Sequence, residues 1–133
     1  MTYKPRILEE LVRKAAENYP VVTITGPRQS GKTMFCRAMF PRKPYVSLEP
    51  LDQREFVRVD PRGFLSEYPE GAVIDEIQNA PDLTSYIQGI VDDDPEPGRY
   101  VVTGSQHFGL TQSVNQSLAG LSLIHISEPT RPY

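Results

Sequence analysis

The sequence predicts an α/β fold of three layers, in which a mainly parallel sheet lies between helices. Short β-branched apolar runs alternate along the chain with segments of helical periodicity. A glycine-rich loop stands directly between the first of these runs and a helix. The chain has 133 residues, 38% of them hydrophobic, which suits one domain of ordinary size. Strands that alternate with helices favour a parallel sheet, because each helix returns the chain to the same edge.

The expected elements follow this alternation along the whole chain. In order they are a helix at 6–19, a strand at 21–25, a helix at 31–40, a strand at 45–49, two short helices within 51–71, a strand at 72–75, a helix from Asp82 to about Val91, a strand at 99–103 and a helix at 107–120. Pro20 and Pro41 end the first two helices. The first helix places its apolar residues on one face: Ile7, Leu8, Leu11, Val12 and Ala15.

Composition excludes several classes of protein. The net charge of −3 gives no overall attraction to nucleic acid, and the sequence contains no basic stripe. These observations do not support nucleic-acid binding, and the question stays open. No apolar run reaches the ~18 residues that a membrane span needs, and the N-terminus has no signal-peptide pattern. The single Cys36 cannot form an internal disulfide and is expected to be a small core side chain. These features predict a cytoplasmic protein with no membrane contact.

The strongest chemical signal is the run "GPRQSGKT", which fits the pattern G-x-x-x-x-G-K-[ST]. Two glycines let the backbone wrap around phosphates, and the following helix adds positive charge from its dipole. Lys32 is expected to reach the β- and γ-phosphates, and the Thr33 hydroxyl to ligate Mg²⁺. Arg28 is either a phosphate ligand or a solvated loop charge. The predicted ATP-binding residues are Gly26, Pro27, Arg28, Gln29, Ser30, Gly31, Lys32 and Thr33.

Acidic and polar residues follow two later strands. Asp75 ends the apolar run "AVID" and Glu76 follows it, at the sheet edge where ligands of open α/β sheets bind. Asp75 is expected to hold Mg²⁺, directly or through a water, opposite Thr33. Glu76 is expected to polarise the attacking water; the alternative for the pair is a solvated turn.

After the strand at 99–103, Thr103, Ser105 and Gln106 are polar. Ser105 and Gln106 are the two candidates for sensing the γ-phosphate, and the alternative is a turn that caps the next helix. No arginine has a spacing that marks it as a charge-stabilising finger, neither Arg99 nor the arginines of 51–71.

Three motifs occur in order: "GPRQSGKT", "VIDEIQNAPDL" and "VVTGSQHFGL" with a later "QSLAG". Over residues 1–120 the chain resembles the AAA-type ATPases of bacteria and archaea that carry a C-terminal domain of unknown function. The resemblance implies an AAA+ P-loop NTPase sheet of strand order 5-1-4-3-2, with ATP and Mg²⁺ as cofactors. Lys32 and Thr33 match Walker A, Asp75 and Glu76 match Walker B, and Ser105–Gln106 matches sensor 1.

The resemblance implies a hydrolase that cleaves ATP, with Glu76, Lys32, Ser105 and Gln106 as catalytic residues. ATP is the expected partner, and the family resemblance allows a homo-oligomer. The alternatives are a nucleotide-binding switch without significant turnover and a P-loop phosphotransferase. A GTPase is disfavoured because the chain has no N-K-x-D guanine reader.

The last segment, "LSLIHISEPTRPY" at 121–133, departs from the family pattern. It resembles the translation of one reading frame of a DNA-sequencing-library adapter. We therefore expect residues 1–120 to be a fragment, a partial AAA+ ATP-binding domain, and 121–133 to be a non-native tail. The alternative is a genuine C-terminal strand. The tail has a strand's alternation, and it could pair beside the strand at 21–25 in place of a missing fifth strand.

Overall fold

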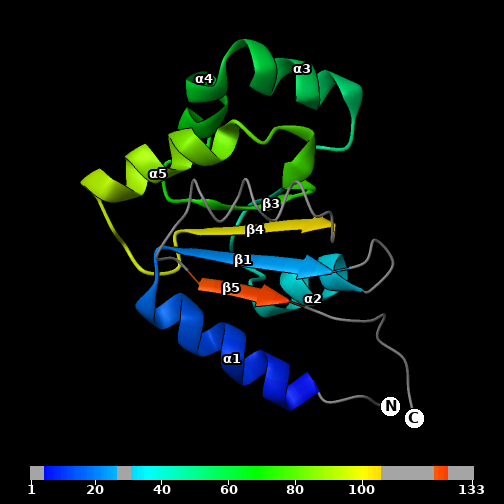
Figure 1. The fold of residues 1–133 in the computed structure, drawn as a ribbon, viewed down its shortest axis with the longest axis vertical. Coiled ribbons are helices and arrows are strands. Elements are labelled where there is room, and N and C mark those ends of the chain that lie inside the picture. Colours follow the sequence, from blue (N-terminus) through cyan, green and yellow to red (C-terminus); the bar gives the residue numbers. More distant parts are fainter. Residues whose placement is uncertain (1–4, 27–30, 106–121, 126–133) are drawn as a thin grey trace.

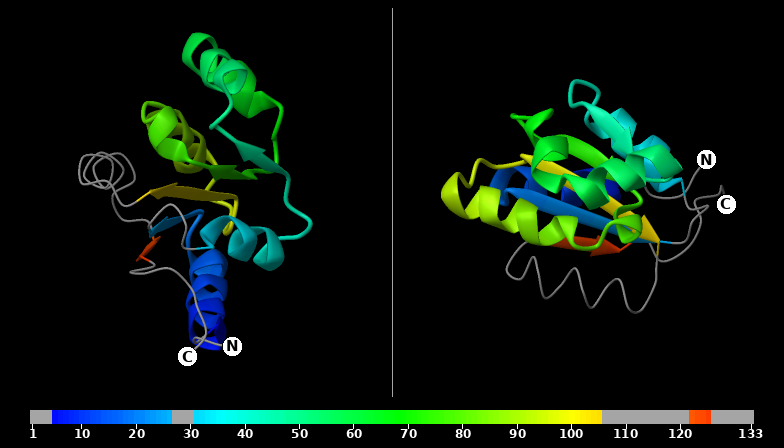
Figure 2. Two further views of the ribbon diagram at one scale, coloured as in Figure 1. Left: turned by 90° about the vertical axis from the view of Figure 1, so that its right-hand side faces the viewer. Right: turned by 90° about the horizontal axis from the view of Figure 1, so that it is seen from above.

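A computed structural model describes residues 5–26, 31–105 and 122–125, which form one sheet with helices on both faces (Figure 1). In chain order the elements are α1 (Pro5–Asn18), β1 (Val21–Gly26), α2 (Lys32–Met39), β2 (Tyr45–Ser47), α3 (Leu51–Val59), α4 (Pro61–Ser66), β3 (Ala72–Asp75), the 3₁₀ helix η1 (Ile77–Asn79), α5 (Leu83–Asp93), β4 (Tyr100–Ser105) and β5 (Ser122–His125). Helices α1 and α2 cover one face, and α3, α4 and α5 lie over the other (Figure 2).

The sheet has the order β2-β3-β4-β1-β5, and each described pairing is parallel. This confirms the parallel α/β sheet, and the order is the 5-1-4-3-2 arrangement that the resemblance implied. Strand β1 lies between β4 and β5, with Val22 opposite Ser122. Residues 122–125 thus pair beside β1, the position that the alternating pattern of the tail allowed. The non-native origin of residues 121–133 stays a prediction.

The sheet separates two hydrophobic cores. One core lies under α3, α4 and α5 and includes Ile74, Tyr100 and Val102; the other lies under α1 and α2 and includes Val73 and Val101. Successive residues of a strand point to opposite faces, so neighbours along β3 and β4 enter different cores. All six residues of β1 are buried, as expected for a strand whose two faces are both covered.

The first helix buries fewer residues than its apolar pattern predicted. Val12 and Ala15 are buried and Leu8 is partly buried, a spacing of four and three that forms one narrow stripe. Ile7 and Leu11 are 61% and 52% exposed. The five residues share one side of the helix as predicted, but Ile7 and Leu11 lie toward its edge, about 110° and 65° around the helix from the centre of the buried stripe.

The remaining boundaries agree with the sequence reading within a few residues. The region 51–71 contains two short helices, and the Asp60 carboxylate caps α4 by accepting from the Gly63 N–H at 3.0 Å. Asp82 precedes α5 but makes no side-chain cap bond, and the helix runs on to Asp93. The helix expected at 107–120 lies outside the described residues. Within the part of the chain that the structure describes, no helix has the length and apolar character to cross a membrane.

Candidate functional site

The start of α2 follows β1 through the glycine-rich run. Gly31 has φ 84° and ψ 11°, a left-handed conformation that glycine adopts without steric cost. Lys32 begins the helix and is only 1% exposed, and Thr33 is partly buried behind it. The first N–H groups of a helix have no partner within the helix and carry partial positive charge. Residues 27–30 of the predicted ATP-binding set lie outside the described residues.

The carboxylate of Asp75 accepts hydrogen bonds from three hydroxyl groups. Thr33 Oγ1 donates to Asp75 Oδ2 at 2.9 Å, and the Tyr45 hydroxyl donates to the same oxygen at 2.5 Å. The Thr103 hydroxyl donates to the other oxygen, Oδ1. Asp75 is 4% exposed, so this carboxylate is enclosed by its donors. The expected meeting of Asp75 and Thr33 at one edge of the sheet is therefore present.

Strand register explains this meeting. Val73 belongs to the core under α2, and Asp75 is two residues further along β3, so its side chain lies on the same face. Ile74 is paired with Val102, which places Thr103 beside Asp75 on the neighbouring strand. Thr33 lies in the first turn of α2 above this face.

Glu76 leaves the sheet in a different direction. Its φ of 63° and ψ of 52° are left-handed, and it is the only non-glycine residue with positive φ among those described. Its N–H donates to Thr103 Oγ1 at 3.2 Å, and its carboxylate oxygen Oε1 accepts from Gln78 Nε2. Glu76 is 6% exposed. A left-handed glutamate costs of order 1–3 kcal/mol, and such strain concentrates at functional sites. The two adjacent carboxylates therefore have separate partners, while the Thr103 hydroxyl bonds both residues.

Burial, together with the charges at this edge, shifts the pKa values of two nearby groups. Burial raises the pKa of the Tyr45 phenol, and the hydrogen bond to Asp75 and its negative charge raise it further. Burial also raises the pKa of the Cys36 thiol to about 12; the charge of Asp75 adds to this, and the positive charge of Lys32 opposes it. Cys36 is fully buried in the core under α2, which agrees with its expected role.

Of the two phosphate-sensing candidates, the backbone of Ser105 ends β4 opposite Gly26, where the glycine-rich run begins. Gln106 lies outside the described residues. The sequence reading noted Thr103 as polar but did not place it on Asp75. It missed Tyr45 and Gln78 altogether. The available signal for Tyr45 was its alternation with Ser47, which puts two polar groups on one face of a strand.

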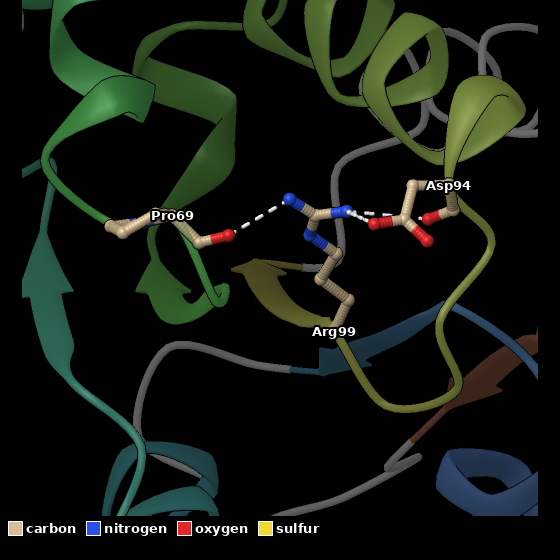
Figure 3. Close-up of polar contacts among 3 residues, drawn as sticks. All are labelled: Pro69, Asp94 and Arg99. Atoms are coloured by element: carbon tan, nitrogen blue, oxygen red, sulfur yellow. Dashed lines mark hydrogen bonds and ion pairs between the residues drawn. The ribbon is translucent and has the colours of Figure 1, made fainter.

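Arg99 lies at the amino end of β4, away from Asp75. Its Nη1 donates to the Asp94 carbonyl at 3.3 Å and to Asp94 Oδ2 at 3.1 Å, and its Nη2 donates to the Pro69 carbonyl at 2.8 Å (Figure 3). Arg99 thereby joins the loop after α5 to the segment before β3. These hydrogen bonds give Arg99 a structural role.

The oxygen atoms of Asp75 and Thr33 suit a hard cation that also binds phosphate. Among the described residues, no group of three or more His, Cys, Asp and Glu side chains could hold a metal ion. Thr33 and Asp75 instead bring one hydroxyl and one carboxylate together. Mg²⁺ is usually held by one or two carboxylates together with phosphate oxygens and waters. The residues present therefore fit Mg²⁺ that arrives with a nucleotide.

Comparison with known proteins extends this description. A family model described as an AAA domain matches residues 18–128. Two uncharacterized proteins, from Mycobacterium bovis and Mycobacterium tuberculosis, are each 34% identical over 118 residues. The match covers 87% of this chain and 27% of each relative, so the chain spans about a quarter of the length of these curated relatives.

Two solved structures have a similar fold. The Walker-type ATPase of Pyrococcus abyssi gives a TM-score of 0.61 at 15% identity, over 96% of this chain and 54% of that one. A DNA replication initiation factor gives 0.59 at 16% identity, over 95% of this chain and 47% of that one. At identities this low, the similarity bears on the fold alone. The TM-scores confirm the predicted α/β fold with its parallel sheet.

Proposed function

This chain belongs to the AAA domain family of P-loop ATPases, and we propose that it binds ATP with Mg²⁺ and hydrolyses the terminal phosphoanhydride bond. The observation that carries the proposal is the 2.9 Å hydrogen bond from Thr33 Oγ1 to Asp75 Oδ2. It joins the helix after the glycine-rich run to the acid at the end of β3. An anion site and a cation site therefore adjoin, which is the arrangement a magnesium-bound triphosphate requires.

Phosphate binding is assigned to the run from Gly26 to Thr33. The N–H groups at the start of α2 and the helix dipole favour negative charge at this point. The Lys32 ammonium adds a full positive charge at the first position of the helix. Its burial, at 1% exposure, keeps this charge out of bulk water, where it attracts an anion more strongly.

The metal position is assigned to Thr33 and Asp75. Because the Thr33 hydroxyl donates its hydrogen to Asp75, its oxygen lone pairs are left to ligate a cation. Mg²⁺, when bound, neutralises the charge that develops on the β- and γ-phosphates. Asp75 contributes a negative charge that balances the cation and orients the hydroxyl.

Glu76 is assigned to orient and deprotonate the attacking water, and Ser105 and Gln106 to sense the γ-phosphate. Support for Glu76 comes from its place one residue after Asp75 and from its left-handed backbone, a strained conformation of the kind that concentrates at functional sites. Gln78 holds that carboxylate by donating to Oε1. We expect this contact to slow turnover until the attacking water replaces Gln78 as the donor to Glu76.

Titration calorimetry with ATP and Mg²⁺ tests the binding proposal. Lys32→Ala removes a charged donor, so we expect affinity to fall by about 10-fold to 150-fold, corresponding to roughly 1.5–3 kcal/mol. Lys43→Ala is the matched control, because the Lys43 ammonium donates to the Arg99 carbonyl at the opposite end of the sheet. Equal affinity of wild type and Lys32→Ala would end the proposal.

A second candidate is a nucleotide-binding switch with little turnover. The Gln78 contact favours it, because the Glu76 carboxylate is already engaged. Phosphate-release assays on wild type and Glu76→Gln separate the two functions. A slow rate that the substitution lowers further by at least about tenfold supports hydrolysis through Glu76. Equal rates support the switch.

What hydrolysis drives is a property of the longer protein. Residues beyond the quarter that this chain spans would supply the moving domain, and we propose that the full protein couples hydrolysis to it. Assembly as a homo-oligomer and a cytoplasmic location, where ATP and Mg²⁺ are available, are parts of the same proposal.

A further inference from the structure

A tyrosine on the neighbouring strand holds the acid that faces the metal position. The Tyr45 hydroxyl donates to Asp75 Oδ2 at 2.5 Å, a normal length for a hydroxyl bound to a carboxylate. Thr33 Oγ1 donates to the same oxygen at 2.9 Å. A carboxylate oxygen has about two lone-pair sites, so these two donors fill Oδ2. Tyr45 and Thr33 therefore act on one atom from two different elements, β2 and α2.

The sheet and α2 fix the Tyr45 ring in this position. Tyr45 pairs with Val73, which puts Asp75 two residues further along the adjacent strand and on the same face. The ring packs against the core under α2, and the Arg37 guanidinium lies 4.7 Å from its centroid. Arg37 is four residues after Thr33, so one face of the same helix carries both groups.

The other carboxylate oxygen is held as well, because the Thr103 hydroxyl donates to Oδ1. Donors on both oxygens stop the carboxylate from rotating. In this orientation Oδ2 faces the Thr33 hydroxyl, and the lone pairs of the Thr33 oxygen are left for a cation. Without the Tyr45 donor, Oδ2 keeps only the bond from Thr33, so the carboxylate is held less firmly against that hydroxyl.

We propose that Tyr45 is a positioning residue that fixes the Asp75 carboxylate against the Thr33 hydroxyl and so sets the affinity of the site for Mg²⁺. This inference rests on the proposed function, because it assigns a task at the same site. It predicts a selective defect, since the Tyr45 hydroxyl bonds Asp75 at the metal position, whereas the contact with α2 is made by the ring, over which Arg37 lies. Binding of metal-free ATP should therefore be spared.

The test is Tyr45→Phe, which keeps the ring and its contact with Arg37 and removes only the hydroxyl. ATP is titrated into the protein with Mg²⁺ and again with a chelator, and Mg²⁺ is titrated into the ATP-bound protein. Outer partners of metal ligands typically change metal affinity by 10–100-fold. We expect Tyr45→Phe to weaken Mg²⁺ binding by at least about tenfold and to change metal-free ATP affinity by less than about twofold.

Tyr68→Phe is the matched control. It removes a phenol hydroxyl from a partly buried ring that contacts Phe64, in the segment between α4 and β3. Both affinities should match wild type in this variant. Thermal melting of each variant checks that the fold is kept; we expect Tyr45→Phe to fold, because phenylalanine fits a half-buried strand position.

The outcomes separate this inference from the proposed function. Wild-type affinity for Mg²⁺ in Tyr45→Phe, with ATP still bound and Lys32→Ala defective, overturns the role of Tyr45 alone. Loss of metal-free ATP binding in Tyr45→Phe also overturns it, because the residue would then support the phosphate site. Absence of ATP binding in wild type overturns both.

Discussion

Removing the Thr103 hydroxyl should destabilise the protein more than removing an ordinary buried hydroxyl. Thr103 is fully buried, and its hydroxyl has two partners. It donates to Asp75 Oδ1 and accepts from the Glu76 N–H at 3.2 Å. Thr103→Val has the same shape but neither bond. The carboxylate then loses a donor, and the Glu76 N–H is left in the interior with no partner from this side chain.

The magnitude follows from these two losses. A hydrogen bond to a charged group contributes about 1.5–3 kcal/mol, and an unsatisfied buried N–H costs about 1–3 kcal/mol. Because the two share one atom, we expect a combined loss of about 3–5 kcal/mol in the free energy of unfolding. For a chain of this size, that corresponds to a melting temperature lower by roughly 10 °C or more. Urea denaturation with an unchanged m value measures the free-energy loss directly.

Two variants control for the substitution itself. Thr103→Ser keeps the hydroxyl and should retain most of the stability. Thr84→Val removes another buried hydroxyl, one that donates to the Pro81 carbonyl at 2.8 Å. That carbonyl still accepts from the Thr84 N–H at 3.2 Å, so the loss should be about 1 kcal/mol or less. If Thr103→Val costs no more than Thr84→Val, the reasoning about the buried carboxylate is wrong.

The structure makes three further predictions. Arg99→Ala should lower stability by about 1–3 kcal/mol in urea denaturation while ATP affinity stays at the wild-type value, because the guanidinium joins Asp94 to the segment before β3; reduced ATP affinity would contradict this. Gly71→Ala should cost about 3 kcal/mol or more, since φ is 98° and a Cβ would lie 1.6 Å from the Arg99 carbonyl oxygen. Gly89→Ala, where a Cβ meets no atom within 4 Å, should instead stabilise α5 by up to about 1 kcal/mol; equal effects at the two glycines would refute the reasoning. Iodoacetamide should label Cys36 at pH 8 far more slowly in the native protein than in the urea-unfolded protein. A thiol pKa of about 12 lowers the thiolate fraction roughly a thousandfold relative to a thiol of pKa 9.0. Equal labelling rates would contradict the burial of Cys36.

The sequence predicted those parts of the fold in which chemistry and pattern agree. The run "AVID", three apolar residues followed by an aspartate, forms β3 with the expected bounds, because a short apolar run of this kind is typical of a buried strand. The contact between Thr33 and Asp75 was also predictable. In a parallel sheet the carboxyl ends of neighbouring strands meet at one edge, and the glycine-rich loop leads there.

Other parts of the site depend on details that pattern alone does not contain. Tyr45 looks like any aromatic residue of a strand, and only the register with Val73 brings its hydroxyl to Asp75. The left-handed backbone of Glu76 could not be foreseen, because glutamate rarely adopts it. In the same way, the exposure of Leu11 depends on how α1 is rotated over the sheet.

The central claim is that Asp75 and Thr33 together support Mg²⁺ at an ATP site. The most direct measurement is the ratio of ATP affinities with and without Mg²⁺, in wild type and in Asp75→Asn, which keeps the shape of the side chain and removes its charge. We predict that Mg²⁺ strengthens ATP binding in wild type by at least about tenfold and leaves binding to Asp75→Asn nearly unchanged. The same strengthening in both proteins would contradict the account.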